Sequence, residues 1–134
     1  MPHTYQLTLN STFEESERVP DFVDQLQKER GLDDEITDNF MLLLSEAVTN
    51  AIDHGNEGDP SKKVYVNIEI SDKKIFASVR DEGVGFTPDL NRNPLSEENL
   101  LDDSGRGVFL LNQIADELEF KDEGRVVEFA LLRK

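Results

Sequence analysis

The sequence contains no cysteine, and its basic residues are few, with 14 Lys and Arg against 29 Asp and Glu. The lack of cysteine excludes disulfides and thiol chemistry and fits a reducing compartment, so we expect a cytoplasmic protein. The net charge of −15 repels phosphate backbones and anionic lipids, which argues against direct binding to nucleic acid or membranes. An anionic ligand would have to be held by local devices such as helix ends, backbone amides or a metal ion.

Long apolar runs and targeting signals are also missing. No apolar stretch approaches the ~20 residues of a membrane span, and residues 1–9 lack the basic region and apolar segment of a signal peptide. No internal repeat or low-complexity tract occurs. A chain of 134 residues, 37% hydrophobic and 32% charged, is long enough for one substantial core, so we expect a single domain over residues 1–134.

The most informative stretch is Leu42–Asn56, LLLSEAVTNAIDHGN. Its apolar residues recur with helical spacing and predict one buried side, formed by Phe40, Leu43, Leu44, Ala47, Val48, Ala51 and Ile52. Glu46, Asn50 and His54 follow one another at steps of four and form a polar column beside that side. A carboxylate and an amide stacked in this way can both contact one ligand lying along the helix.

The remaining chain predicts strands and two more helices around this one. We expect a strand at Thr4–Leu9, a polar turn at Asn10–Glu17, and a helix with Pro20 in its first turn that ends at Gly31. Asp33 or Asp34 can cap the central helix, and Gly55 can end it in a left-handed conformation. Later segments are a hairpin with strands at 64–70 and 75–79, a helix from Gly105 with Val108, Leu111, Ala115 and Leu118 facing inward, and strands at 118–121 and 125–132. This order predicts an α+β fold, a two-layer sandwich in which helices cover one face of a mostly antiparallel, mixed sheet.

Two glycine motifs flank a long irregular segment. Asp81-Glu82-Gly83-Val84-Gly85-Phe86 follows a predicted strand, and Gly105-Arg106-Gly107 opens a helix. Glycines at a helix start let backbone N–H groups approach a phosphate chain, and a carboxylate at a strand end can accept a hydrogen bond from an exocyclic amine. Each motif alone also fits an ordinary cap or an Asx turn. Thr87–Ser104 between them is long enough to be a lid or a disordered insert.

The polar column allows specific chemistry. Asn50 offers a neutral oxygen ligand of the kind that Mg²⁺ accepts beside water and phosphate oxygens. Glu46, one turn earlier, can orient or deprotonate a hydroxyl or water. Both residues also fit a solvated helix flank. His54 has no His or Cys partner for a zinc site, so we expect it to cap the helix or lie on the surface.

Taken together, the three motifs in this order resemble the GHKL ATPase superfamily, which includes gyrase, Hsp90-type chaperones, histidine kinases and MutL. More narrowly, the stretches SEAVTNAIDHG, VRDEGVGF and SGRGVFLL are similar to those of bacterial anti-sigma-factor serine kinases. The resemblance runs from about Phe13 to Lys134. It implies the Bergerat-type sandwich described above, with no room for a second domain.

The resemblance also implies a role for each matching residue. Glu46 corresponds to the general base, Asn50 to the Mg²⁺ ligand and Asp81 to the carboxylate that reads the adenine amino group. Residues 87–104 correspond to the ATP lid. The remaining nucleotide-binding positions are the pocket floor and the phosphate hinge, namely Gly83, Gly85, Phe86, Gly105, Arg106, Gly107 and Val108.

The implied function is an ATP- and Mg²⁺-dependent protein serine/threonine kinase that phosphorylates a STAS-type anti-anti-sigma protein and sequesters a sigma factor. A homodimer is expected because relatives commonly dimerise. Arg125 departs from the family pattern, which usually has Gly-Thr at this hairpin, and the departure leaves open a non-catalytic, nucleotide-gated partner switch. A detached histidine-kinase catalytic domain is a third reading, although no His-bearing dimerisation helix precedes the domain.

Overall fold

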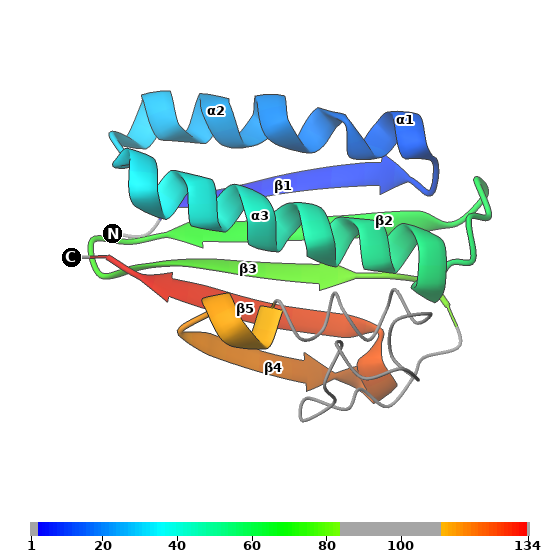
Figure 1. Ribbon diagram of the computed structural model, residues 1–134. Coiled ribbons are helices and arrows are strands. Elements are labelled where there is room, and N and C mark those ends of the chain that lie inside the picture. The colour runs from blue at the N-terminus through cyan, green and yellow to red at the C-terminus, as the bar shows by residue number, and fades with distance from the viewer. Residues whose placement is uncertain (1–2, 84–110, 134) are drawn as a thin grey trace, which may run out of the picture.

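The computed structural model describes residues 3–83 and 111–133 (Figure 1). The strands are β1 (His3–Asn10), β2 (Lys63–Ile70), β3 (Lys74–Arg80), β4 (Glu117–Lys121) and β5 (Val126–Leu132). The helices are α1 (Phe13–Ser16), α2 (Arg18–Arg30) and α3 (Asp34–Asn50), with a π-helical turn η1 (Ala51–Gly55) and a 3-10 turn η2 (Asp122–Gly124). Residues 111–114 form a further helical turn before β4.

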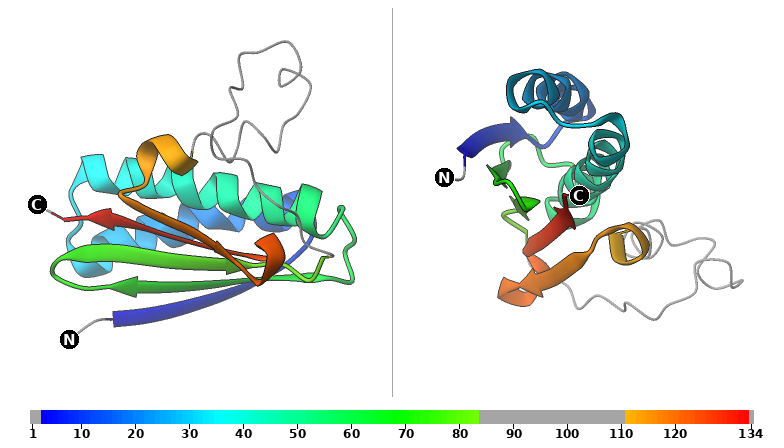
Figure 2. Two further views of the ribbon diagram at one scale, coloured as in Figure 1. Left: turned by 90° about the horizontal axis from the view of Figure 1, so that it is seen from below. Right: turned by 90° about the vertical axis from the view of Figure 1, so that its left-hand side faces the viewer.

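The five strands form one sheet in the order β1-β2-β3-β5-β4. The helices lie on one face of it, with α2 and α3 side by side (Figures 1 and 2). This arrangement confirms the predicted α+β sandwich, with β1 at one edge of the sheet. Every neighbouring pair among these strands is antiparallel, so the parallel pairing implied by a mixed sheet does not occur in the described part of the chain.

The core lies between the sheet and α3. Alternate residues of β2 and β3 are buried, as their period of two predicts, and all seven residues predicted for the inner side of the central helix are buried. Phe40 of α3 meets Phe129 of β5 with ring centroids 6.1 Å apart. Each large apolar side chain buried in this way contributes about 1.5–3 kcal/mol. This contact area fixes α3 against β3 and β5.

The predicted ends of two helices are confirmed. Asp33 is the residue that caps α3, because its side chain accepts a hydrogen bond from the backbone N–H of Ile36 (2.9 Å). Gly31 ends α2 with a left-handed φ of +64°. No helix within residues 3–83 and 111–133 has both the length and the apolar character needed to cross a membrane.

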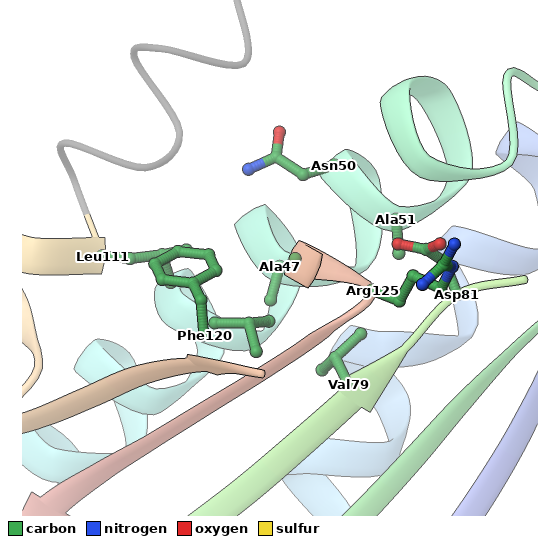
Figure 3. A pocket seen from close by; sticks show the side chains of 10 residues that line it. Ala47, Asn50, Ala51, Val79, Asp81, Leu111, Phe120 and Arg125 are labelled. Atoms are coloured by element: carbon green, nitrogen blue, oxygen red, sulfur yellow. The ribbon is translucent and has the colours of Figure 1, made fainter. Parts of the chain in front are cut away.

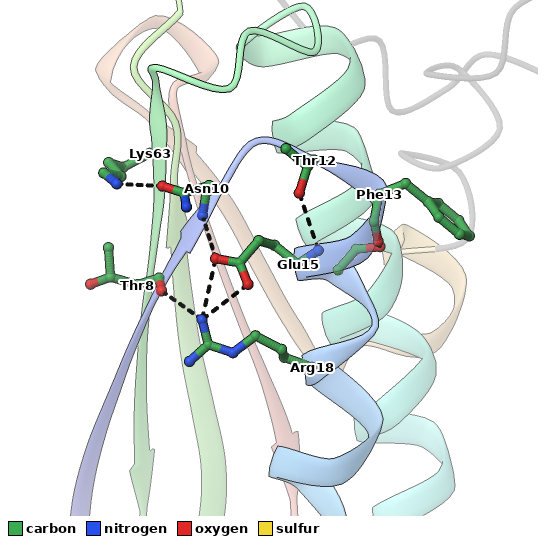
Figure 4. A network of polar contacts seen from close by, with 8 residues as sticks. Thr8, Asn10, Thr12, Phe13, Glu15, Arg18 and Lys63 are labelled. Atoms are coloured by element: carbon green, nitrogen blue, oxygen red, sulfur yellow. Dashed lines mark hydrogen bonds and ion pairs between the residues drawn. The ribbon is translucent and has the colours of Figure 1, made fainter.

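The polar segment Asn10–Glu17, predicted as a turn, contains the short helix α1. Thr12 accepts a hydrogen bond from the N–H of Glu15 (3.2 Å), and the Glu15 carboxylate accepts one from the N–H of Asn10 (3.2 Å) (Figure 4). Arg18 lies 3.3 Å from the same carboxylate. The T-x-x-E spacing of residues 12–15 is the signature of a capping box, and it would have predicted this helix.

Two further predictions are wrong. Gly55 does not end the central helix in a left-handed conformation: the chain continues as η1, and the positive φ angles occur at Glu57 (54°) and Gly58 (69°). Leu118 belongs to β4 and not to the preceding helix, because the carbonyl of Leu111 accepts the hydrogen bond of Ala115 and helical geometry stops there. The β4 prediction itself is confirmed.

Candidate functional site

A pocket opens between α3 and the ends of β3 and β5. Apolar side chains form most of its wall, with Asp81, Arg125 and Asn50 as the polar members (Figure 3). The apolar lining residues are Ala47, Ala51, Val79, Leu111, Phe120 and Val127, with Gly124 beside them. The enclosed volume is about 20 Å³, and the wider hollow of about 330 Å³ includes open solvent. A mostly apolar hollow with few polar groups is typical of sites that bind a planar organic ligand.

Asp81 is the buried charge of this pocket. It follows β3 directly, and only 5% of its surface is exposed. Its Oδ1 accepts a hydrogen bond from the backbone N–H of Gly83 (2.8 Å). Burial raises the pKa of the Asp81 carboxyl above its ordinary value, while the Gly83 N–H and the nearby cations of Arg125, Arg80 and Lys62 act in the opposite direction. Such a carboxyl in an apolar hollow is a candidate for ligand recognition.

Two glycines allow the backbone to pass close to this carboxyl. A Cβ added to Gly55 would lie 2.2 Å from Oδ2 of Asp81, and a Cβ added to Gly83 would lie 1.7 Å from the carbonyl oxygen of Gly55. Any side chain at either position would therefore displace η1 or the turn after β3. This explains why glycine stands at 55 without a left-handed φ, and it shows that Gly83 packs closely against Gly55 beside Asp81.

Arg125, between η2 and β5, holds the other side of the Asp81 turn. Its Nε donates to the carbonyl oxygen of Gly83 (2.8 Å), and its own carbonyl accepts a hydrogen bond from the N–H of Asp81 (2.9 Å). Its Nη1 donates to the carbonyl of Asp122 (3.2 Å). The side chain noted in the sequence only as a departure from the family pattern is thus part of the pocket wall.

Asn56 is a structural residue that sequence reasoning missed. It is fully buried, and its Nδ2 donates to Oγ of Ser11 (2.8 Å) and to the carbonyl of Lys63 (3.0 Å). Its Oδ1 accepts a hydrogen bond from the N–H of Glu82 (2.7 Å). One side chain thereby joins η1, the segment after β1, the start of β2 and the turn after β3. Its position next to a glycine, after a helix, was the only local signal.

The polar column on the central helix is only partly preserved. Asn50 is one of the residues that line the pocket, and in Figure 3 its amide points away from Asp81. Glu46 is half-buried one turn earlier on α3 and is not among the residues that line the pocket. His54 is exposed on η1, whose wider π-helical turn interrupts the regular spacing.

Asn50 and Asp81 therefore line the same pocket, and Gly83 contacts Asp81, whereas Glu46 lies one helical turn before Asn50 and does not line the pocket. Other predicted nucleotide-binding residues lie outside the described part of the chain, as does the predicted lid at 87–104. They are Gly85, Phe86, Gly105, Arg106, Gly107 and Val108. In residues 3–83 and 111–133, no three His, Cys, Asp or Glu side chains are grouped so that they could hold a metal ion. Asn50 remains the candidate that could contribute a neutral oxygen beside phosphate oxygens of a ligand.

Comparison with known proteins gives a consistent family. Residues 9–131 match the histidine kinase-like ATPase domain. The anti-sigma F factor of Shouchella clausii is 37% identical over 94 residues, which cover 69% of this chain and 64% of that protein. The anti-sigma F factor of Bacillus cytotoxicus is 42% identical over 79 residues, covering 58% of this chain and 54% of that protein. The corresponding protein of Oceanobacillus iheyensis is 37% identical over 103 residues, covering 75% and 68%.

One solved structure has the same fold. The crystal structure of the RsbU and RsbW domains of Rv1364c from Mycobacterium tuberculosis superposes with a TM-score of 0.68 at 19% sequence identity. The match covers 98% of this chain and 32% of that one. The chain thus spans less than two thirds of the first two curated relatives and about a third of the solved protein.

Proposed function

The chain belongs to the histidine kinase-like ATPase domain family, and we propose that it is an ATP-dependent protein serine/threonine kinase of the anti-sigma type. Membership of an ATPase family implies nucleotide binding. The observation that carries the proposal is the pocket in which the buried Asp81 faces apolar walls at the end of β3, with Asn50 among the lining residues and Glu46 one turn earlier on the same helix. Relatives named anti-sigma F factors support the choice of reaction and partners.

The pocket suits the base of ATP. A planar purine would lie against Ala47, Ala51 and Val79, and its exocyclic amino group would donate to the Asp81 carboxylate. The absence of Cβ atoms at Gly55 and Gly83 supports this fit, because it lets the backbone at both positions pack closely beside the Asp81 carboxyl. Asp81 is thus the proposed adenine-reading residue.

The phosphates would extend from this pocket toward the open side. Asn50, which lines the pocket, would hold Mg²⁺ together with phosphate oxygens and water. Bound there, Mg²⁺ would neutralise phosphate charge. The backbone amides of Gly85, Gly105 and Gly107, with Phe86, Arg106 and Val108 around them, are proposed to hold the remainder of the nucleotide under a lid at residues 87–104.

Glu46 is the proposed general base. In the transfer, the oxygen of a substrate Ser or Thr hydroxyl forms a bond to the γ-phosphorus, the bond to the β–γ bridging oxygen breaks, and ADP leaves. The hydroxyl proton passes to Glu46, which is half-buried on α3 one turn before Asn50. This chemistry depends on positioning, since the transition state needs little covalent help from the protein.

The proposed protein substrate is a STAS-type anti-anti-sigma protein, and the proposed second partner is a sigma factor, so the chain would regulate transcription in the cytoplasm. We propose a homodimer as the functional state and one domain over residues 1–134. The alternative is a nucleotide-gated partner switch without transfer. Arg125, which departs from the family pattern inside the pocket, favours that alternative.

The test is incubation with Mg·[γ-³²P]ATP and the STAS protein encoded beside this chain. Label on a Ser or Thr of the STAS protein supports the kinase, and Glu46→Ala should then abolish labelling while calorimetry still shows nearly unchanged Mg·ATP binding. Binding of ATP without any label on the STAS protein would favour the switch. If Glu46→Ala lost binding and labelling equally, Glu46 would not be the base.

A further inference from the structure

Arg125 is attached to the turn after β3 at two points. Its carbonyl accepts the N–H of Asp81 (2.9 Å), which extends the pairing of β3 with β5 by one residue, and its Nε donates to the carbonyl of Gly83 (2.8 Å). Asp81 and Gly83 are the two ends of the turn that carries the buried carboxyl. The turn cannot shift away from β5 without breaking both hydrogen bonds.

The guanidinium is itself held in a defined orientation. Nη1 donates to the carbonyl of Asp122 (3.2 Å) and lies 3.4 Å from its Oδ1, so η2 fixes one end of the group while Gly83 fixes the other. The planar guanidinium of arginine loses less conformational entropy for each hydrogen bond formed than the flexible ammonium group of lysine does. Arg125 also lines the same pocket as Asp81 (Figure 3).

The charges around Asp81 come from three directions. Arg80 is on the strand before it, Lys62 is on the loop before β2, and Arg125 is on the hairpin opposite. The side chain of Arg80 is 55% exposed and paired with Asp122, whereas that of Arg125 is 27% exposed. Solvent screens an exposed charge more strongly. On η1, which packs against the carboxyl through Gly55, Asp53 and His54 are exposed.

We propose that Arg125 is a positioning residue for the base-reading carboxylate: it fixes the Asp81–Gly83 turn through two hydrogen bonds, one to each end of the turn, and brings a cation near the carboxylate. The purine as ligand rests on the proposed function, whereas the effect of Arg125 on Asp81 does not. Arg125 acts through Asp81 and requires no contact with the nucleotide.

The experiment compares Arg125→Met, Arg125→Lys and Arg80→Met with the unchanged protein. Carbon-13 NMR follows the titration of the Asp81 carboxyl in ligand-free protein, and calorimetry gives the Mg·ATP dissociation constant across pH. Arg125→Met should move the Asp81 midpoint upward and weaken ATP about tenfold at pH 7, the effect of losing one charge-assisted hydrogen bond. Arg125→Lys should restore the midpoint but leave ATP binding weak, because an ammonium lacks the planar Nε–H donor. Arg80→Met should move the midpoint less than Arg125→Met.

Several results would overturn the proposal. Unchanged Asp81 titration and ATP affinity in Arg125→Met would do so, and so would weaker binding with an unmoved midpoint, since that pattern means general scaffolding. Should Arg125→Met fail to fold, Arg125→Lys decides, and wild-type ATP affinity in that variant refutes the hydrogen-bonding role. Failure of the unchanged protein to bind Mg·ATP would count against the proposed function, while the NMR titration would still decide the role of Arg125.

Discussion

Replacing Gly55 with alanine is expected to destroy the proposed base-reading site while leaving a folded protein. The new Cβ would lie 2.2 Å from Oδ2, 2.4 Å from Cγ and 2.9 Å from Cβ of Asp81. Ordinary contacts between such atoms are about 3.5–4 Å, so the carboxyl or η1 has to move by about 1 Å or more. Forcing an extra methyl group into a packed region costs roughly 1–3 kcal/mol. Displacing the carboxylate removes its bond to the purine amino group, which corresponds to at least about tenfold weaker ATP.

Gly31→Ala is the matched control for this variant. Gly31 has a φ of +64° and no atom within 4 Å of an added Cβ, so alanine there costs about 1–2 kcal/mol through backbone strain alone. Both variants should therefore melt lower, by roughly 3–4 °C per kcal/mol for a chain of this size. Calorimetry should find wild-type Mg·ATP affinity only in Gly31→Ala. Equal affinity in both variants would refute the idea that the contact with Gly55 positions Asp81.

Three other substitutions test separate parts of the site. Asp81→Asn should weaken ATP more than tenfold yet preserve or raise the free energy of unfolding at pH 7. Because burial raises the pKa of Asp81, the native protein should lose stability as pH rises from about 4 through the folded-state pKa, and urea unfolding of Asp81→Asn should lack that loss; an identical pH profile would contradict this. Asn56→Ala leaves the N–H of Glu82, the hydroxyl of Ser11 and the carbonyl of Lys63 without the hydrogen bonds that Asn56 makes to them, which should lower the unfolding free energy by about 2–4 kcal/mol in urea; a loss under 1 kcal/mol would contradict the role of Asn56 as a buried junction. Asn50→Ala should reduce the Mg²⁺ dependence of ATP binding with little effect on ATP measured in excess chelator, and equal losses in both conditions would remove Asn50 as the ligand.

The sequence predicted the layers because burial leaves a local periodic pattern. The predicted inner residues from Phe40 of α3 to Ile52 of η1 are buried where a 3.6-residue period places them, and β2 and β3 alternate with a period of two. Asp33 and Gly31 were identifiable as helix ends from side-chain type alone. The T-x-x-E spacing at residues 12–15 was an equally local signal for α1, although the Glu15 carboxylate bonds to the N–H of Asn10 and not to that of the cap residue Thr12.

The site was harder to predict because its contacts join distant residues. Nothing near Gly55 in the sequence indicates that Asp81 packs on it, and the bond from Arg125 to Gly83 spans 42 positions. Asn56 contacts Glu82 across 26 positions. Local propensity therefore predicted a left-handed, helix-ending conformation at Gly55. The structure has positive φ angles instead at Glu57 and at Gly58, whose φ is +69°. Only the tertiary contact explains glycine at 55.

The energetics of Asp81 argue for a ligand independently of any resemblance. Burial disfavours the ionised form of the Asp81 carboxyl. The backbone N–H of Gly83 and the nearby Arg125 cation favour it, and the glycines at 55 and 83 leave room for the close packing of the backbone around it. An amide of the same shape would accept the Gly83 hydrogen bond without the cost of burying a charge. Selection for stability alone would therefore favour an amide over a carboxyl at this position. A donor arriving from outside provides that reason, since the carboxylate is the stronger acceptor for an amino group in an apolar pocket, and this predicts that Mg·ATP stabilises the native protein more than Asp81→Asn.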